Sequence, residues 1–308
     1  MTASLPRRTS VVIPCYNGAA FVAAAIDSCL SEGVPGGQII VVDDGSTDAT
    51  ADVLAGYADR IRVRRQANAG ASKARNAGLA LVETPYMLFF DADDLYDGGI
   101  IAALEAEMIR SRADIGFGAI QNVRPDGSLG RRVRPPDPTD PQRFLEAWLS
   151  GHTVQTNSHM WRSAFLRGIG GYRAEMKTLE EIEVVVRGIL AGATLAVTDT
   201  GQSLYIDRGN ADRVRYGNSP EVIRSAVDGF AAVEASLNTH GQRRALGKRY
   251  YQQARSAFRQ GYSALGHEAL ARARACGFRG HLGTRGHRIL CGIFGLERKE
   301  RWSGRQLR

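Results

Sequence analysis

Residues 38–48 read QIIVVDDGSTD, an apolar run that changes abruptly into an acidic, glycine-containing segment. The β-branched residues at 39–42 favour a buried strand, and the segment after them favours a loop. The same signal predicts three more strands, at 10–14, 61–65 and 86–90. Apolar residues at helical spacing predict helices at 19–31, 48–57, 72–82 and 97–110. Alternating strands and helices of this kind predict an α/β fold with a parallel sheet covered on both faces.

Acidic side chains gather where the predicted strands end. Five carboxylates follow two of the strands, and these are Asp43, Asp44, Asp91, Asp93 and Asp94. Because open α/β sheets bind ligands beyond the carboxyl ends of their strands, we expect these acids at one edge. Turn chemistry accounts for some of them, and a bound cation or hydrogen-bond donors would relieve their repulsion. Neither a glycine-rich dinucleotide motif nor a P-loop motif is present, which favours a metal ion for handling phosphates.

The composition bounds the class of protein. The 308 residues are 44% hydrophobic and 23% charged, which excludes collagen-like, disulfide-stapled and wholly disordered proteins. The four cysteines lack C-x-x-C spacing, so we expect buried thiols in a reducing cytoplasm. We find neither an apolar run of ~18 residues nor a secretory signal pattern. The expected location is the cytoplasm, with a peripheral position on the inner face of the membrane as the second reading.

Charge is divided unevenly along the chain. Residues 1–200 carry 20 basic and 24 acidic side chains, whereas residues 201–308 carry 20 basic and only 8 acidic ones. Helices are predicted in the basic region at 221–237, 243–264 and 267–276. An apolar segment at 287–296 follows, and then come Arg298, Lys299, Arg301 and Trp302.

Apolar and aromatic residues among arginines favour a helix that lies on an anionic membrane surface. Two other readings of the basic region stay open: a solvated helical face, and a basic lid that helps to hold a diphosphate. Charge alone would permit a nucleic-acid arm, but no known binding motif supports one, so no nucleic acid is expected as a partner.

Four motifs occur in order along the first third of the chain: VVIPCYN at 11–17, VVDDGSTD at 41–48, NAG at 68–70 with ARNAG at 74–78, and FDADD at 90–94. In order and spacing they resemble the family 2 glycosyltransferases over roughly residues 9–110. A fainter similarity runs to about residue 200, through GGY at 170–172 and LEEIE at 179–183. The resemblance implies the GT-A fold, in which helices flank a Rossmann-like, mainly parallel sheet.

The resemblance also implies a division of the chain. Residues 1–215 would form the GT-A domain, with a nucleotide-binding half at about 9–110 and an acceptor half at about 111–215. A hairpin at 117–134 and a helix at 142–150 are predicted in the second half. Residues 216–308 would form a helical, basic C-terminal region.

For the nucleotide, the resemblance implies roles on the loops that follow the first two strands. Pro14, Tyr16 and Asn17 would border the nucleotide, and the Tyr16 ring would pack on its base. Asp44 would accept a hydrogen bond from the base, with Asp43 beside it. These positions belong to the VVIPCYN and VVDDGSTD motifs.

For the diphosphate, the resemblance implies roles on the next two loops. Lys73 and Arg75 would face the nucleotide and its diphosphate. Asp91 and Asp93 form an Asp-x-Asp motif, in which Asp93 would ligate Mn²⁺ or Mg²⁺ and Asp91 would lie nearer the ribose. Both ions prefer oxygen ligands, and residues i and i+2 of an extended segment point to the same side. The alternative reading is an acidic turn that caps the next helix.

The resemblance places the catalytic base at Glu181. Family members carry Glu-Asp at the start of a helix, whereas this chain has Glu180-Glu181. A glutamate can accept the proton of an acceptor hydroxyl, although acidic residues are also favoured in the first turn of any helix. His159 and Trp161 would contact sugar, and the alternative is a tryptophan half-buried in the sheet and a histidine that bonds the backbone.

Together these expectations describe an inverting, metal-dependent glycosyltransferase. It would move a sugar from a nucleotide-diphosphate donor, with a UDP-sugar favoured, to a saccharide or lipid-linked hydroxyl in cell-surface polysaccharide assembly. A sugar-1-phosphate nucleotidyltransferase is an alternative, although residues 15–20 are not the glycine-rich basic loop it requires. The second alternative is a catalytically inactive scaffold that binds a nucleotide-sugar, because the Glu180-Glu181 pair departs from the family pattern.

Overall fold

The computed structural model describes residues 8–176, 178–209 and 219–305. Contacts within the chain divide it into two compact units. The first unit holds the described residues of Met1–Pro141, Val154–Met176 and Arg187–Gly209, and the second holds those of Gln142–Thr153, Lys177–Val186 and Asn210–Arg308. The second unit thus includes two segments that the sequence analysis assigned to residues 1–215. One reason is that Gln142 bonds Gln242 of the C-terminal helices, with 3.2 Å between amide nitrogen and oxygen.

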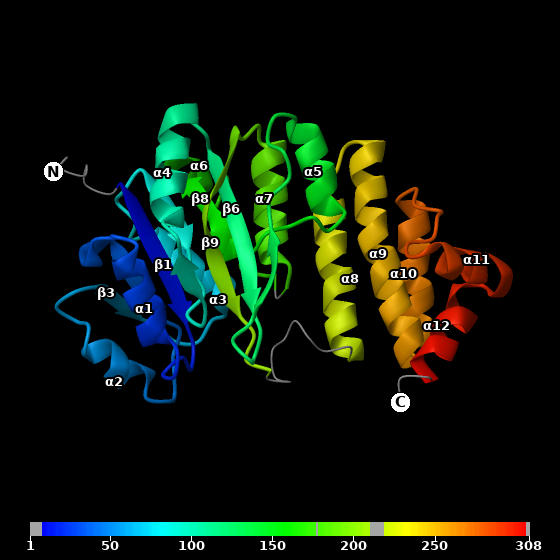
Figure 1. Cartoon of the computed structure of the whole chain (residues 1–308), viewed down its shortest axis with the longest axis horizontal. Coiled ribbons are helices and arrows are strands. Elements are labelled where there is room, and N and C mark those ends of the chain that lie inside the picture. The colour runs from blue at the N-terminus through cyan, green and yellow to red at the C-terminus, as the bar shows by residue number, and fades with distance from the viewer. Residues whose placement is uncertain (1–7, 177, 210–218, 306–308) are drawn as a thin grey trace. The chain divides into compact units, whose positions relative to one another are not determined.

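The first unit contains a nine-stranded sheet (Figure 1). Its N-terminal strands pair in the order β3-β2-β1-β4, and all of these pairs are parallel. They are β1 (Thr9–Cys15), β2 (Ile39–Asp43), β3 (Arg62–Arg65) and β4 (Tyr86–Phe89). All four predicted strands are therefore confirmed, in the parallel arrangement that their apolar composition indicates.

The rest of the sheet mixes parallel and antiparallel pairs. The strand β8 (His159–Arg162) runs antiparallel to β4 and to β6 (Ile115–Val123), and β9 (Leu195–Ile206) runs parallel to β6. The predicted hairpin is confirmed as β6 with β7 (Leu129–Val133). The sequence analysis did not predict β9 or the short edge strand β5 (Leu95–Asp97).

Helices cover both faces of the parallel strands. Val11 and Ile13 of β1 belong to a buried core with residues of α1 (Val22–Ser31) and α4 (Ile100–Ser111). The intervening Val12 faces α3 (Ala71–Leu79), because successive side chains of a strand point to opposite faces. Two short helices complete the unit, α2 (Thr50–Ala55) and α6 (Ser163–Gly168).

Helix α3 approaches the sheet closely at Gly78. A Cβ atom added there would lie 2.2 Å from Cγ1 of Val12, which is fully buried. Only glycine therefore allows the helix to pack at this distance. This packing matters for the site, because α3 carries Lys73 and Arg75.

The second unit is helical, and Figure 1 shows α8 (Pro220–Glu234), α9 (His240–Gln260) and α10 (Ser263–Ala275) side by side. Helix α9 packs against α8, α10 and α12 (Leu296–Arg305) and buries Tyr250, Tyr251 and Phe258. The predicted helices at 221–237, 243–264 and 267–276 are thus confirmed. The predicted segment at 287–296 lies mostly in α11 (Arg285–Phe294) and ends at the first residue of α12, because the chain turns at Gly295 with φ of +78°.

Two further elements belong partly to the second unit. Helix α5 (Pro141–Leu149) buries Phe144 and Trp148, and α7 (Glu180–Leu190) begins in the second unit and ends in the first. All four cysteines of the chain lie in the described part, and each is buried and free, as predicted. Within the described residues, no helix is both long and apolar enough to cross a membrane.

Strand β8 lies inside the sheet, between β4 and β6. Its residues His159 and Trp161 are fully buried. The His159 ring packs against Phe117 with 5.2 Å between ring centroids, and its Nε2 lies 3.1 Å from the carbonyl oxygen of Val154. Loss of hydration lowers the pKa of His159 from 6.5 to about 3, so the ring is neutral in the folded protein.

This burial predicts a specific pH dependence of stability. The unfolded state binds a proton at His159 below pH 6.5, whereas the folded state does so only near pH 3. The free energy of unfolding therefore keeps the full contribution of the neutral ring above pH 6.5 and loses it as the pH falls toward 3. The contribution is at most ~1.4 kcal/mol per pH unit. Urea unfolding between about pH 7 and about pH 4 should show a shallower decline for His159→Gln than for the wild type.

The control for this prediction is His240→Gln, which makes the same change at an exposed histidine. Its unfolding free energy should follow the pH dependence of the wild type. Equal slopes for His159→Gln and the wild type would contradict the account of a buried, neutral histidine.

Candidate functional site

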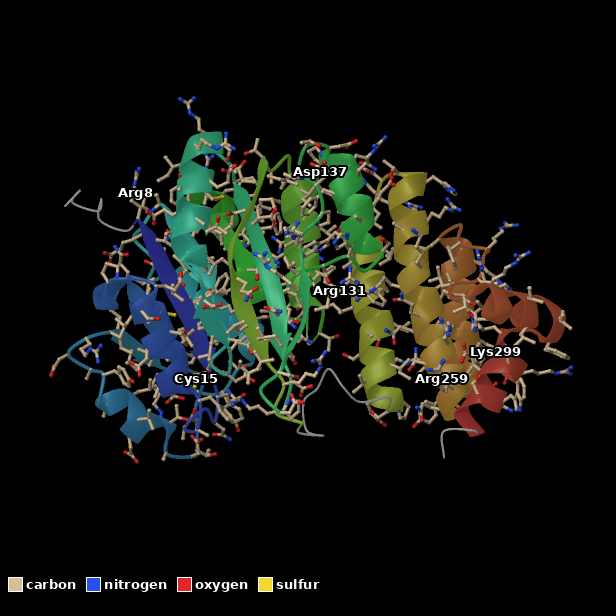
Figure 2. The ribbon with its side chains drawn as sticks, viewed as in Figure 1. Arg8, Cys15, Arg131, Asp137, Arg259 and Lys299 are labelled. Carbon is tan, nitrogen blue, oxygen red and sulfur yellow. The ribbon has the colours of Figure 1, made fainter. Side chains whose placement is uncertain are left out.

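The four N-terminal strands end at one edge of the sheet. Cys15 pairs with Asp43, and Asp43 pairs with Arg65, so β1, β2 and β3 stop at the same level. The end of β4 lies beside them, because the N–H of Phe90 donates to the carbonyl of Val12 at 2.8 Å. Figure 2 labels Cys15 at this end of β1. The loops that carry the predicted nucleotide and metal residues therefore leave the sheet together, as expected.

Asn17 joins the first loop to the second. Its backbone has φ of +51°, a conformation that asparagine tolerates better than most residues. Its Oδ1 accepts the N–H of Thr47 at 2.8 Å, and its own N–H donates to Oγ of Ser46 at 2.9 Å. Its neighbours differ in exposure: Pro14 is partly buried, whereas Tyr16 has 53% of its surface exposed. The Tyr16 ring thus offers a free aromatic face at this edge.

Asp43 and Asp44 are almost completely buried, and each accepts hydrogen bonds. Asp43 accepts the N–H of Ser46 at 2.8 Å and lies 3.4 Å from Nε of Arg65. Asp44 accepts hydrogen bonds from the Gln66 side chain at 2.7 Å and from the N–H groups of residues 69 and 70 at 3.0 and 2.8 Å. Hydrogen-bond donors therefore relieve the charge of both acids, and Asp44 ties the second loop to the third.

Helix α3 presents two basic residues differently. Lys73 is exposed, whereas Arg75 is buried and donates from Nη2 to Oδ1 of Asp91 at 3.0 Å. The Arg75 guanidinium also lies 5.2 Å from the ring centroid of Tyr172. Arg75 and Asp91 are thus held as a pair, with 27% of the Asp91 side chain exposed.

The acidic segment after β4 is a turn. The N–H of Asp94 donates to the carbonyl of Asp91 at 3.3 Å, so the extended segment assumed in the sequence analysis is wrong. Asp94 is buried and accepts from Nδ2 of Asn157 at 2.5 Å and from the N–H of Ile206 at 2.9 Å. Asn157 also accepts the N–H of Asp91 at 2.9 Å. Asp94 and Asn157 therefore fix the turn that presents Asp91 and Asp93.

Arg208 is a further residue of this site that the sequence analysis missed. It follows β9, donates from Nη2 to the carbonyl of Asp93 at 2.8 Å, and lies 4.1 Å over the ring centroid of Phe21. Its buried Nε has no hydrogen-bond partner among the described residues. A fixed guanidinium beside the acidic turn can attract an anionic ligand. The sequence offered no signal for it, because its position depends on a strand that was not predicted.

The donor set of the acidic turn fits a divalent metal ion held jointly with a substrate. Asp91 and Asp93 provide carboxylate oxygens, which Mg²⁺ and Mn²⁺ prefer, and both are only partly buried. Within the described ranges, no group of three or more His, Cys, Asp or Glu side chains is placed to hold an ion by itself. Mg²⁺ is commonly bound by one or two carboxylates together with substrate phosphates, which is what this turn could supply.

Glu181 lies in the second unit, in the first turn of α7. The residue before that helix, Leu179, has φ of +62°, a strained conformation for leucine. The N–H groups of Ile182 and Glu183 both donate to the Leu179 carbonyl at 3.0 Å. Glu181 is mostly buried and interacts electrostatically with Arg249. Burial lowers the pKa of Arg249, and the nearby Glu181 carboxylate acts in the opposite direction.

Two groups of predicted residues lie as their alternative readings describe, except that Trp161 is fully buried rather than half-buried. Glu180, Glu181 and Glu183 do form the acidic first turn of a helix, which is compatible with a catalytic role for one of them. His159 and Trp161 lie inside the sheet with no exposed surface, so we do not place them in contact with sugar.

The family comparison covers the sheet edge described above. The sequence model of the family described as "Glycosyl transferase family 2" matches residues 10–168, which is more than half of the chain. This range includes the loops of Asn17 and Asp44, helix α3 and the acidic turn.

Curated relatives match over shorter parts of their own length. The uncharacterized glycosyltransferase EpsJ of Bacillus subtilis (strain 168) is 31% identical over 168 residues, 51% of this chain and 47% of that protein. The succinoglycan biosynthesis protein ExoU of Rhizobium meliloti (strain 1021) is 28% identical over 226 residues, 68% of this chain and 65% of that protein. The chain therefore spans about half or less of the first relatives that it matches.

Solved structures share the fold at low sequence identity. S. aureus TarS 1–349 superposes with a TM-score of 0.67 and 18% identity over 98% of this chain and 92% of that chain. TarS 1–349 in complex with UDP-GlcNAc superposes with a TM-score of 0.66 and 18% identity, over 87% of this chain and 79% of that chain. The mannosyltransferase PcManGT of Pyrobaculum calidifontis, in complex with GDP-Man and Mn²⁺, superposes with a TM-score of 0.59 and 16% identity, over 98% of this chain and 84% of that chain.

These structural neighbours are GT-A glycosyltransferases, which confirms the predicted fold class. The motifs that carried the resemblance also lie on the loops that the first unit gathers at one edge. The family match adds the sequence support that the fold alone does not provide. The chain belongs to glycosyl transferase family 2.

Proposed function

We propose that this glycosyltransferase moves a sugar from a nucleotide-diphosphate donor to an acceptor hydroxyl with inversion at the anomeric carbon, assisted by Mn²⁺ or Mg²⁺. The observation that carries the proposal is the sheet edge where the Asp91–Asp94 turn lies beside Arg75 and Arg208. A diphosphate needs positive charge to bind and to leave, and these two guanidinium groups stand next to the carboxylates of the turn. The metal complex of PcManGT with GDP-Man supports the same donor class.

In this proposal, each loop has a separate task. Pro14, Tyr16 and Asn17 border the nucleotide, and the Tyr16 ring packs on its base. Asp44 accepts a hydrogen bond from the base, with Asp43 beside it.

Asp93 would hold the metal ion, which when bound neutralises charge on the diphosphate, and Asp91 would lie nearer the ribose. Lys73 and Arg75 face the nucleotide and diphosphate, and Arg208 keeps the turn in place through the Asp93 carbonyl.

Glu181 is the proposed general base. Its carboxylate accepts the proton of the acceptor hydroxyl while that oxygen forms a bond to the anomeric carbon. The bond from the anomeric carbon to the phosphate oxygen breaks, and the nucleoside diphosphate leaves with its electron pair. Attack from the face opposite the leaving group inverts the configuration.

The UDP-GlcNAc complex of TarS supports a UDP-sugar as the first donor to test, with a hexose or N-acetylhexosamine as the sugar. The relationship to a succinoglycan biosynthesis protein supports a saccharide or lipid-linked acceptor in cell-surface polysaccharide assembly. Donor binding without release of UDP or of any other nucleoside diphosphate would instead identify a nucleotide-sugar-binding scaffold. Release of pyrophosphate from a nucleoside triphosphate and a sugar phosphate would identify a nucleotidyltransferase.

The metal assignment predicts the behaviour of Asp93→Asn. Calorimetry with UDP should show binding at least ~10-fold tighter with Mn²⁺ than with a chelator in the wild type, because the ion joins carboxylate to phosphate. The variant should lose this metal-dependent gain. Asp52→Asn, at an exposed acid of α2, is the matched control and should keep it. A metal-dependent gain that persists in Asp93→Asn would rule out this ligand.

The base assignment predicts a loss of turnover without a loss of donor binding in Glu181→Gln. Removing a positioned general base should slow transfer by ~10²–10⁴-fold, measured as nucleotide release in the presence of acceptor. Glu181→Asp keeps a carboxylate and should lose less activity. Glu221→Gln changes an exposed acid in the first turn of α8 and should have no effect. Wild-type turnover in Glu181→Gln would move the base elsewhere.

A further inference from the structure

Exposed large apolar side chains are concentrated on α11 and α12. In the part of the chain that the structure describes, eight such side chains are exposed, and four of them lie on these two helices. They are Ile289, Ile293, Phe294 and Trp302, with exposed fractions between 53% and 67%. A concentration of this kind marks a surface that contacts something other than water.

Helix α11 exposes its apolar face. Residues 289, 290, 293 and 294 follow helical spacing, so Ile, Leu, Ile and Phe side chains share one face. The two residues that the helix buries are instead His287 and Cys291. An amphipathic helix that packed by hydrophobicity alone would turn the first set inward. The apolar face of α11, defined by these four positions, is therefore directed mainly to the outside.

The two acidic side chains of α12 are paired within the second unit. Glu300 is fully buried and bonds Arg255 at 2.7 Å and Arg259 at 2.8 Å, between guanidinium nitrogen and carboxylate oxygen. Figure 2 labels Arg259, together with Lys299, in this part of the second unit. Glu297 accepts a hydrogen bond from the Ser263 hydroxyl at 2.5 Å. These contacts occupy the two acids of α12 with other residues of the same unit.

Several basic side chains of the two helices are exposed. Arg285 and Arg288 of α11 are exposed. On α12, Arg298 precedes Trp302 by four residues, so both lie on one exposed face. Each of the two helices thus exposes large apolar groups together with positive charge.

We propose that the apolar face of α11 and Trp302 of α12 dock on an anionic lipid bilayer. Apolar groups would enter the boundary between headgroups and acyl chains, and the flanking arginines would contact anionic headgroups. Tryptophan favours this depth. A helix of 10 residues is ~15 Å long and lies along such a surface rather than across it. This inference goes beyond the proposed transfer reaction and does not depend on its chemistry.

Charge favours lipid over a second copy of the chain as the occupant. Two copies that met through this face would bring Arg285, Arg288 and Arg298 of each toward like charges of the other, which is unfavourable. An anionic headgroup layer offers the opposite charge over the whole surface.

The experiment is flotation of the full chain with phosphatidylcholine vesicles that contain or lack phosphatidylglycerol. We expect binding to vesicles with phosphatidylglycerol, weakened by salt. Ile293→Ser combined with Phe294→Ser should lower the partition coefficient at least ~10-fold, since two large apolar groups would no longer be buried. Leu129→Ser, at a residue of β7 that is 56% exposed, is the matched control and should not change binding.

The electrostatic part is tested separately. Arg288→Gln should weaken binding about fivefold, because each basic residue near an anionic surface contributes at this scale. Arg244→Gln removes the same charge from an exposed position near the start of α9 and should have little effect. Equal losses in both variants would show a response to net charge alone and would overturn the assigned surface.

Other results decide between occupants. The proposal is overturned by absence of vesicle binding, by equal binding to both lipid compositions, or by a dimer in sedimentation equilibrium that the Ile293→Ser and Phe294→Ser change dissociates while no vesicle binding occurs. Calorimetry with UDP and Mn²⁺ should be unchanged in all these variants, which touch no residue of the nucleotide site. A failure of the membrane proposal is thus distinguishable from a failure of the proposed transfer.

Discussion

The candidate site depends on a buried carboxylate at the end of β2. Asp44 accepts hydrogen bonds from the Gln66 side chain and from the N–H groups of residues 69 and 70, and it is almost fully buried. A carboxylate is stable in such a place only when donors surround it, so its charge requires the loop after β3 to converge on β2. Asn17 extends the connection to the loop after β1. The shape of the sheet edge therefore follows from paired donors and acceptors rather than from hydrophobic packing.

Burial separates the aspartates of this edge by role. Asp43, Asp44 and Asp94 are buried and accept hydrogen bonds from neighbouring donors, so their charge is used to fix loops. Asp91 and Asp93 are only partly buried and stand on the turn that the others support. All five follow a strand, and only the resemblance assigns them different roles. The donors around each carboxylate, many of which come from distant segments, decide how much of it stays open to a ligand.

The sequence predicted the elements that a local residue pattern determines. It did not predict the strand and side chains whose positions depend on partners far along the chain. The β-branched run at 39–42 and its equivalents identified the parallel strands, and the acids after them were rightly expected at one edge. Strand β9 was not predicted because polar residues interrupt its apolar pattern. Arg208, which follows that strand, was therefore missed as well. Asn157 was missed because its partner Asp94 lies 63 residues away. The resemblance alone suggests a sugar contact for His159, and no local pattern indicates that its polar segment forms a strand between two others.

The excess of positive charge in the C-terminal region does not have to serve the diphosphate. In the first unit, Arg75 and Arg208 already stand beside the acidic turn, each held by a contact within that unit. The two acids of α12 are bonded within the second unit, Glu297 by Ser263 and Glu300 by Arg255 and Arg259, whereas other arginines of α11 and α12 are at the surface. Interactions between exposed charges decay over ~10 Å at moderate salt, so such arginines act on what touches them. Because apolar side chains surround them, the partner they suit must offer both negative charge and an apolar interior.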